Sequence, residues 1–334
     1  MIKILWLAQY SKNGKTLYGG KAYEKRLLDY LSNSEDYEVK EGYPHSNRAN
    51  GGLRWIEELY RLSKLHTHTD VAIRDFYSTA IMGKMSGRSI AIIHHVDSSQ
   101  KKHPFINKLL EKKIIANFDK IDTIVTVSEY WKKRFEKMGH TDVRVVYNGF
   151  NISSFDITNE EVMMFKEKYG LVKKPIIYLG NHQRAKGIVE AYRALKKANA
   201  YLVTSGEKDS SLGIPVLHFN LGYKDYLTLL KASSVVVALS KFKEGWNRTV
   251  HEAMLCKTPV VGLAQGGMEE LLSGGNQLIY SPVHTDWLHQ LFTLPELVEM
   301  ALMRKTELGE SGYEYASQFT LERFARDWKK VLKG

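Results

Sequence analysis

Short runs of β-branched and small apolar residues recur along the whole chain, separated by longer stretches of helical periodicity. Two of these runs, Ser234–Leu239 and Thr258–Leu263, lie one helix apart and have the continuous apolar character of buried parallel strands. Similar runs occur at Ile2–Ala8, Tyr37–Glu41, Val71–Arg74, Ser89–Ile93, Thr123–Val127, Arg144–Val146, Pro175–Leu179, Tyr201–Thr204, Val216–Phe219 and Gln277–Tyr280. Strands that alternate with helices in this way predict an α/β protein with doubly wound sheets.

Length and composition narrow the class of protein further. A chain of 334 residues fits two domains of ordinary size, and 43% hydrophobic with 25% charged residues is typical of a globular protein. The only cysteine, Cys256, excludes a disulfide framework and a multi-cysteine metal site within one chain. The apolar start, Met1–Ala8, is too short for an export signal, and no run reaches the roughly 20 apolar residues of a membrane span. We therefore expect a cytoplasmic location.

The stretch between the two apolar runs named first carries two carboxylates. Glu244 follows the strand Ser234–Leu239 on a loop, and Glu252 lies eight residues later in a helix that should start near Asn247. In open α/β sheets the carboxyl end of a strand is where ligands bind, and backbone N–H groups there can hold phosphate. One carboxylate could therefore contact each end of a ligand, although two glutamates at this spacing can also be solvated residues of an ordinary amphipathic helix.

The longer segment Glu244–Val261, followed by the glycine pair Gly266-Gly267, resembles the acidic signature of the retaining GT-B glycosyltransferases of the family 4 type. The resemblance implies a GT-B fold, in which two doubly wound Rossmann-like domains face a central cleft. It also implies that Glu244 contacts hydroxyls of the donor sugar and that Glu252 contacts the ribose of the nucleotide. The same segment supplies further donor-binding candidates, which are Gly245, Trp246, Asn247 and Thr249.

The domain organisation follows from the same resemblance. Residues 145–155, which include the turn-forming pair Asn148-Gly149, resemble the family's crossing between domains. We expect an acceptor-side domain at 1–150 and a nucleotide-sugar-binding domain at 151–315. Residues 316–334 contain an amphipathic helix with Thr320 at its N-cap, and in similar proteins such a helix returns to the first domain.

Two further segments resemble parts of the family's donor site. After the strand Pro175–Leu179, Lys186 matches a cation that binds the donor diphosphate, and such a cation would stabilise the leaving group without a metal. Asn181 stands where the family has arginine, so Arg184 is the candidate for the second cation, with an ordinary surface arginine as the alternative. Phe219 ends a strand that resembles the one beside the nucleotide base.

In the amino-terminal half, a glycine pair and a histidine pair follow predicted strands. Gly19 and Gly20 open an amphipathic helix, where glycines permit close approach of a phosphate, and they resemble the family's glycine pair beside the diphosphate and sugar. His94 and His95 end the strand Ser89–Ile93, where the family commonly has one histidine near its catalytic site. Either could be the match, and no third ligand at a suitable spacing supports a metal site.

The net charge of +11 is concentrated in the amino-terminal half. Residues 1–150 hold 25 Lys and Arg against 17 Asp and Glu, whereas the remainder holds 23 against 20. Two basic amphipathic segments contribute most visibly, through Lys101, Lys102, Lys112, Lys113, Lys132, Lys133 and Arg134. This asymmetry indicates an anionic partner, which could be a membrane, a lipid-linked or acidic polymeric acceptor, or, less well supported, nucleic acid. Solubility alone is the simpler explanation.

Together these features predict a metal-independent retaining glycosyltransferase. It would transfer a hexose from a nucleotide-diphosphate sugar, with UDP favoured over GDP, to a glycan or lipid-linked acceptor, and would need no cofactor beyond that co-substrate. It would be cytoplasmic or peripheral on the inner face of the membrane. Two alternatives stay open, a nucleotide-sugar epimerase of related fold and a non-enzymatic protein that binds anionic surfaces.

Overall fold

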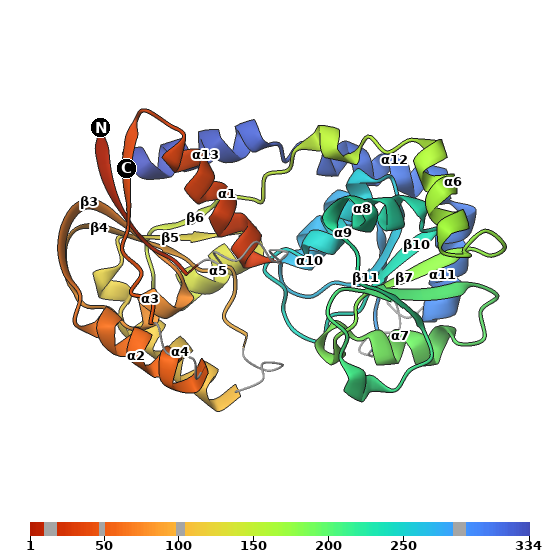
Figure 1. The fold of residues 1–334 in the computed structure, drawn as a ribbon, viewed down its shortest axis with the longest axis horizontal. Coiled ribbons are helices and arrows are strands. Elements are labelled where there is room, and N and C mark those ends of the chain that lie inside the picture. The colour runs from red at the N-terminus through yellow and green to blue at the C-terminus, as the bar shows by residue number, and fades with distance from the viewer. Residues whose placement is uncertain (10–18, 47–50, 98–103, 283–291) are drawn as a thin grey trace. The chain divides into compact units, whose positions relative to one another are not determined.

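The computed structural model describes residues 1–9, 19–46, 51–97, 104–282 and 292–334, and the chain divides into two compact units. Unit 1 comprises Met1–Asn148 together with Glu322–Gly334, and unit 2 comprises Gly149–Leu321. The chain thus passes between units within two residues of the expected boundary at 150. Residues 316–321, which the sequence analysis grouped with the terminal helix, lie in unit 2 (Figure 1).

Unit 1 is built on a six-stranded parallel sheet in the order β2-β1-β3-β4-β5-β6. Its strands are β1 (Ile2–Leu7), β2 (Tyr37–Glu41), β3 (His66–Arg74), β4 (Lys84–Ile92), β5 (Thr123–Thr126) and β6 (Val143–Val145). Its helices are α1 (Gly20–Ser32), α2 (Gly51–Ser63), α3 (Phe76–Ala80), α4 (Pro104–Ala116), α5 (Glu129–Lys137) and α13 (Leu321–Lys333). The apolar runs of the sequence form these strands because helices cover the sheet.

Unit 2 contains a second six-stranded parallel sheet, in the order β12-β11-β10-β7-β8-β9. Its strands are β7 (Ile176–Asn181), β8 (Tyr201–Ser205), β9 (Leu217–Phe219), β10 (Val235–Ala238), β11 (Val260–Leu263) and β12 (Leu278–Tyr280). Its helices are α6 (Asn159–Lys168), α7 (Ile188–Leu195), α8 (Tyr223–Ala232), α9 (Arg248–Leu255), α10 (Gly267–Gly274), α11 (Leu294–Met303) and α12 (Lys305–Ala316). The three central strands β10, β7 and β11 carry the most continuous apolar runs.

The twelve predicted strands are all present, and the doubly wound pattern is confirmed. β3 and β4 each begin five residues before the predicted start, because their polar first halves pair with each other beyond the apolar run. The sequence analysis did not predict α2 or α3. Helix α3 is only five residues long and depends on a capping box between Asp75 and Ser78 rather than on periodicity.

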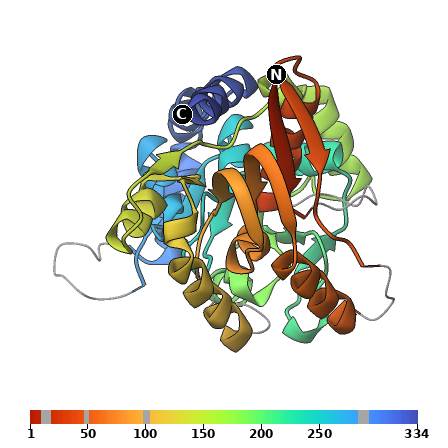
Figure 2. The ribbon, with the colours of Figure 1, turned by 90° about the vertical axis from the view of Figure 1, so that its left-hand side faces the viewer.

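The carboxyl-terminal helix α13 completes the core of unit 1. Trp328 is fully buried, and its Nε1 donates a hydrogen bond of 3.0 Å to the hydroxyl of Tyr23 on α1. That hydroxyl in turn donates to the carbonyl oxygen of Val146 at 3.0 Å, and the Tyr23 ring packs edge-on against Phe324. Both chain ends, marked in Figure 2, belong to unit 1. Within the part of the chain described, no helix is long and apolar enough to cross a membrane.

Each sheet has one point where the strand order reverses. In unit 1 the first strand, β1, lies between β2 and β3, and in unit 2 the first strand, β7, lies between β10 and β8. At such a point the connections leave the sheet in opposite directions, which opens a crevice at the carboxyl ends of the strands. The fold therefore indicates where the polar groups of each unit should be sought.

Candidate active site

An ion pair between Lys186 and Glu244 lies at the reversal point of unit 2. Glu244 follows β10, and Lys186 lies in the short 3₁₀ turn after β7, the strand beside it. Lys186 Nζ donates to Glu244 Oε1 at 2.6 Å, and the Ser240 hydroxyl donates to the same oxygen at 2.5 Å. The Lys186 ammonium also lies 4.9 Å from the centre of the Phe242 ring. Two of the predicted site residues, 58 positions apart in sequence, are thus in contact.

Glycines allow the two loops of this ion pair to approach each other. Gly187 has a left-handed backbone (φ 70°), and a Cβ there would lie 2.0 Å from the carbonyl oxygen of Leu239 at the end of β10. Gly266 (φ 67°) has the same need, since its Cβ would lie 2.4 Å from the carbonyl oxygen of Glu244. The Gly267 N–H donates to that carbonyl at 2.9 Å. The glycine pair after the acidic segment therefore fixes the backbone that carries Glu244.

Glu252, on α9, is held by three donors from two helices. Arg248 donates to its Oε1 at 2.8 Å, and the hydroxyls of Tyr223 and Tyr226 on α8 donate to Oε1 and Oε2 at 3.2 Å each. A carboxylate can accept about four hydrogen bonds, so Oε2 has capacity for one more donor. The Arg248 guanidinium stacks on the Phe150 ring at 5.0 Å. Burial alone would lower the pKa of Arg248, but the charge of Glu252 and its hydrogen bond raise it overall.

The other residues of unit 2 that were predicted to bind the sugar-nucleotide donor make different contacts. Asn247 caps α9 by accepting from Val250 N at 3.2 Å, and its Nδ2 lies 3.4 Å from Glu244 Oε1. The Thr249 hydroxyl lies 3.2 Å from the Tyr226 oxygen and can donate to it while Tyr226 donates to Glu252, which links Thr249 to the partners of Glu252. Gly245, which follows Glu244 in the sequence, is buried.

Trp246 lies in the core of unit 2. Its Nε1 donates to His251 Nδ1 at 2.9 Å, and its ring packs on Phe319. Because this side chain is 3% exposed, a donor contact at this position would come from the backbone. Phe219 ends β9 and packs on Tyr169 at 4.8 Å. Arg184 is exposed in the same turn as Lys186, and nothing in the described residues brings it to Glu244.

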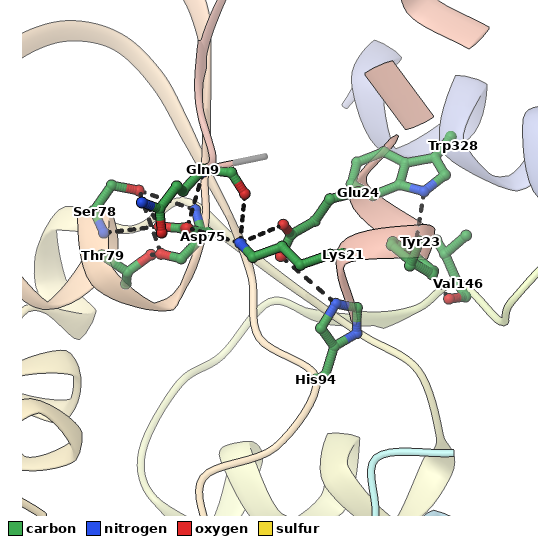
Figure 3. A network of polar contacts seen from close by, with 10 residues as sticks. All are labelled: Gln9, Lys21, Tyr23, Glu24, Asp75, Ser78, Thr79, His94, Val146 and Trp328. Carbon is green, nitrogen blue, oxygen red and sulfur yellow. Dashed lines mark hydrogen bonds and ion pairs between the residues drawn. The ribbon is translucent and has the colours of Figure 1, made fainter. Parts of the chain in front are cut away.

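Unit 1 has a second lysine and carboxylate cluster at its own reversal point, which the sequence analysis missed. Lys21 Nζ donates to Gln9 O at 2.5 Å and to Glu24 Oε2 at 2.8 Å, and it lies 3.4 Å from Asp75 Oδ2 (Figure 3). Gln9 follows β1, Asp75 follows β3, and both Lys21 and Glu24 lie near the start of α1. Asp75 is fixed by its capping box with Ser78. The signal in the sequence was a glutamate on the apolar face of α1.

The predicted glycines and His94 adjoin this cluster. Gly19 adopts φ 55° at the start of α1, and a Cβ on Gly20 would lie 2.7 Å from Cδ2 of the His94 ring. His94 Nε2 lies 3.9 Å from Glu24 Oε1 (Figure 3). His95 instead lies near Trp131, with ring centres 6.2 Å apart. Of the two histidines, His94 is therefore the one that joins the cluster.

Burial shapes the protonation of the unit 1 cluster. It raises the pKa of Glu24 to about 7, with the charge of Lys21 opposing the rise and that of Asp75 adding to it. Burial would lower the pKa of Lys21, but the charges of Glu24 and Asp75 raise it overall. Burial, together with electrostatic effects of the neighbouring His95 and Lys21, lowers the pKa of His94 to about 3. His94 is therefore neutral at pH 7, while Glu24 is close to its midpoint.

Among the described residues of both units, no group of three or more histidine, cysteine or carboxylate side chains is arranged to hold a metal ion. The charged groups of both reversal points are lysine and carboxylate pairs, which suit the recognition of phosphate and hydroxyl groups.

Comparison with known proteins identifies the class to which this fold and site belong. The family model described as Glycosyl transferases group 1 matches residues 160–292, and that described as Glycosyltransferase Family 4 matches residues 24–154. Among curated proteins, the uncharacterized glycosyltransferase MJ1607 of Methanocaldococcus jannaschii is 31% identical over 171 residues, 45% of this chain and 44% of that protein. The match thus spans less than half of that relative. N-acetyl-alpha-D-glucosaminyl L-malate synthase of Bacillus anthracis is 22% identical over 86% of this chain and 77% of that protein.

Solved structures share the fold along the whole chain. Sucrose-phosphate synthase from Thermosynechococcus elongatus has a TM-score of 0.76 at 16% identity, covering 100% of this chain and 98% of that one. Alr3699/HepE of Anabaena, in complex with UDP-glucose, has a TM-score of 0.74 at 18% identity, covering 100% of both chains. These likenesses and the paired α/β units thus define a GT-B fold. The chain belongs to the GT-B glycosyltransferases of the family 4 type, as its acidic segment predicted.

The buried carboxyl of Glu24 gives a prediction for stability against pH. Its folded pKa of about 7 lies above the unfolded value of 4.5, so the folded state binds more protons between these values and stability falls as pH rises. Relative to Glu24→Gln, the wild type should lose about 3 kcal/mol of unfolding free energy between pH 4.5 and pH 8. Urea unfolding followed by tryptophan fluorescence measures this.

The matched control for that measurement is Asp29→Asn, on the exposed side of the same helix. Its difference from wild type should stay constant with pH to within about 0.5 kcal/mol. A difference between wild type and Glu24→Gln that is equally constant would contradict the burial of an ionisable carboxyl at this position.

Proposed function

We propose that this glycosyltransferase is a retaining, metal-independent enzyme that transfers a hexose from a UDP-sugar to a glycan or lipid-linked acceptor. A GDP-sugar is the second candidate donor. The observation that carries the proposal is the Lys186–Glu244 ion pair at the carboxyl ends of β7 and β10, with Glu252 on the helix that follows β10. This arrangement puts a cation and two differently held carboxylates where an open α/β sheet binds its ligand.

Lys186 is the group suited to the leaving nucleotide. When the glycosidic bond of the donor breaks, negative charge develops on the diphosphate, and a fixed ammonium lowers the free energy of that transition state. In the free protein this ammonium is satisfied by Glu244, so the donor must take over one or two of its hydrogen bonds. Glu244 would then turn its released oxygen to hydroxyl groups of the sugar. Arg184, exposed in the same turn, is the candidate for a second cation.

Glu252 is suited to a single hydroxyl group of the ribose. Three of its acceptor positions are filled by Arg248, Tyr223 and Tyr226, and the one left on Oε2 can accept from one ribose hydroxyl. The held carboxylate needs no rearrangement to do so, which favours affinity. The choice of UDP draws support from the relative solved with UDP-glucose, and retention from the resemblance of residues 244–270 to the retaining family.

The acceptor side of the proposal draws on an exposed surface of unit 1. On α4, Leu110 and Ile114 pack in the core, whereas Phe105 (82% exposed) and Leu109 face solvent. The exposed lysines of the same helix are Lys108, Lys112 and Lys113.

Helix α2 also exposes an apolar stripe, which is Leu53, Ile56 and Tyr60. Apolar side chains flanked by lysines suit an anionic bilayer, so we propose a peripheral position on the inner face of the cytoplasmic membrane. Lys101 and Lys102 lie outside the described residues.

The two carboxylates should differ in what they contribute. Glu252→Gln should weaken UDP binding by about tenfold, because it disturbs both the ribose contact and the pair with Arg248. Glu244→Gln should leave UDP affinity nearly intact or raise it, because Lys186 loses its competing partner, while transfer of the sugar falls. Calorimetry with UDP and turnover of UDP-glucose measure the two effects. Equal UDP affinities in wild type and Glu252→Gln would contradict the ribose assignment.

The cation should control turnover. Lys186→Ala should reduce the rate by about 10²-fold or more, since it removes a main stabiliser of the departing diphosphate. Arg184→Ala is the comparison, and a near-normal rate there would exclude Arg184 as the second cation. The wild-type rate should persist in excess chelator. Strict dependence on a divalent cation would overturn the proposed role of Lys186.

The surface of α4 should bind anionic vesicles. Co-sedimentation with phosphatidylglycerol-containing liposomes should be strong at low salt and weaken as salt screens the lysines, each worth roughly 1 kcal/mol. Lys112→Glu/Lys113→Glu should abolish it, and Phe105→Ser should weaken it at every salt concentration. Competing DNA tests nucleic acid as the anionic partner. No binding at low salt would leave a soluble acceptor as the better hypothesis.

A further inference from the structure

Residues near the start of α1 pack against the ring of His94. Gly20 packs against the ring so closely that a Cβ would lie 2.7 Å from Cδ2, and Tyr23 meets it edge-on with ring centres 4.9 Å apart. Glu24, the next residue on the same turn, directs Oε1 toward His94 Nε2 at 3.9 Å (Figure 3). These three neighbours, Gly20, Tyr23 and Glu24, therefore hold the imidazole ring in one orientation.

The two facing atoms lack other partners. His94 Nε2 is buried without a hydrogen bond, and the hydrogen bond of Glu24 to Lys21 uses the other oxygen, Oε2. A separation of 3.9 Å exceeds a hydrogen bond by about 1 Å, and catalytic hydrogen bonds are often long in the free protein and tighten with substrate. Glu24 is the carboxylate that faces Nε2, and the backbone of Gly20 is a second polar neighbour of the ring.

We infer that Glu24 is a positioning residue for His94, holding its proton on Nε2 so that Nδ1 is left as a hydrogen-bond acceptor for a sugar hydroxyl group. A histidine tautomer is set by the hydrogen bond that its second nitrogen makes, and a carboxylate at Nε2 selects the Nε2–H form. Among the described residues, Nδ1 makes no hydrogen bond. This inference rests on the proposed function only for the identity of the sugar.

The pairing of Glu24 with His94 also makes the tautomer of His94 sensitive to pH. The charged and titratable groups that face the pair are Lys21 on α1, Asp75 after β3 and His95 after β4. Burial, opposed by the charge of Lys21 and aided by that of Asp75, raises the pKa of Glu24 to about 7, and the pKa of the His94 ring, lowered to about 3, keeps the ring from taking up a proton in that range. Protonation of Glu24 places its hydrogen toward Nε2, and the ring proton must then sit on Nδ1. The pair thus takes up one proton, and Nδ1 changes from acceptor to donor.

The tautomer can be measured directly, without any substrate. In the full chain labelled with ¹⁵N-histidine, long-range ¹H–¹⁵N spectra distinguish Nε2–H from Nδ1–H, and His94→Gln identifies the signals by their loss. The wild type and the Asp29→Asn control should show Nε2–H at pH 8 and change with a midpoint near pH 7. In Glu24→Gln the change with pH should vanish. A His94 tautomer that does not depend on Glu24, or a ring that titrates as a free imidazole, would overturn the inference.

Activity gives a second readout. With UDP-glucose as donor, the wild-type rate should rise with pH through about 7, and Glu24→Gln should lack that limb. Glu24→Ala should lose about tenfold or more in kcat, because the ring loses its partner, with UDP affinity unchanged. If the hydroxyl belongs to the acceptor, KM for the acceptor rises and donor hydrolysis is unchanged. If it belongs to the donor, hydrolysis falls as well.

These readouts separate the inference from the proposed function. A wild type that neither binds UDP nor consumes UDP-glucose contradicts the proposed function, while the spectra still decide the role of Glu24. A Glu24→Gln protein that keeps the wild-type pH limb contradicts the inference even if transfer is confirmed.

Discussion

An ion pair between a lysine ammonium and a carboxylate lies at the point of strand reversal in each unit of this protein. Taking such charges out of water costs free energy, and a hydrophobic pair of the same size would often fold as well. The ion pairs of Lys186 with Glu244 and of Lys21 with Glu24 nevertheless occupy the reversal points of the two sheets. At these points the backbone leaves a crevice that apolar side chains would close. In the proposed function these charges recognise the ligand, at some expense to stability.

The Lys186–Glu244 pair also illustrates how a site can be prepared before its ligand arrives. Each partner holds the other in place, so little side-chain freedom remains to be lost on binding. In the proposed function the same attraction is partly given up when the donor diphosphate binds, which reduces the net affinity. A site of this kind gains in the transition state, where the charge on the leaving group is largest, more than in the ground state.

The sequence carried most of the fold but only part of the site. The strands were evident because β-branched runs in β7, β10 and β11 are too apolar for any other place than a sheet covered on both sides. Glu244, Glu252 and Lys186 lie in segments that resemble the family. The unit 1 cluster could not be found in that way, because Lys21 and Asp75 are 54 residues apart and meet only through strand order. Trp246 was predicted as a donor-binding residue because it lies inside the acidic signature, but its side chain is buried in the core of unit 2.

The position of α13 has a consequence for how the chain folds. Unit 2 is a single continuous segment, whereas unit 1 is assembled from two segments that flank it. During synthesis, unit 2 can therefore reach its native state while Tyr23 still lacks Trp328 and the core of unit 1 stays open. Unit 1 is complete only after residues 322–334 have left the ribosome. In its connectivity, unit 2 is an insertion within a discontinuous host domain.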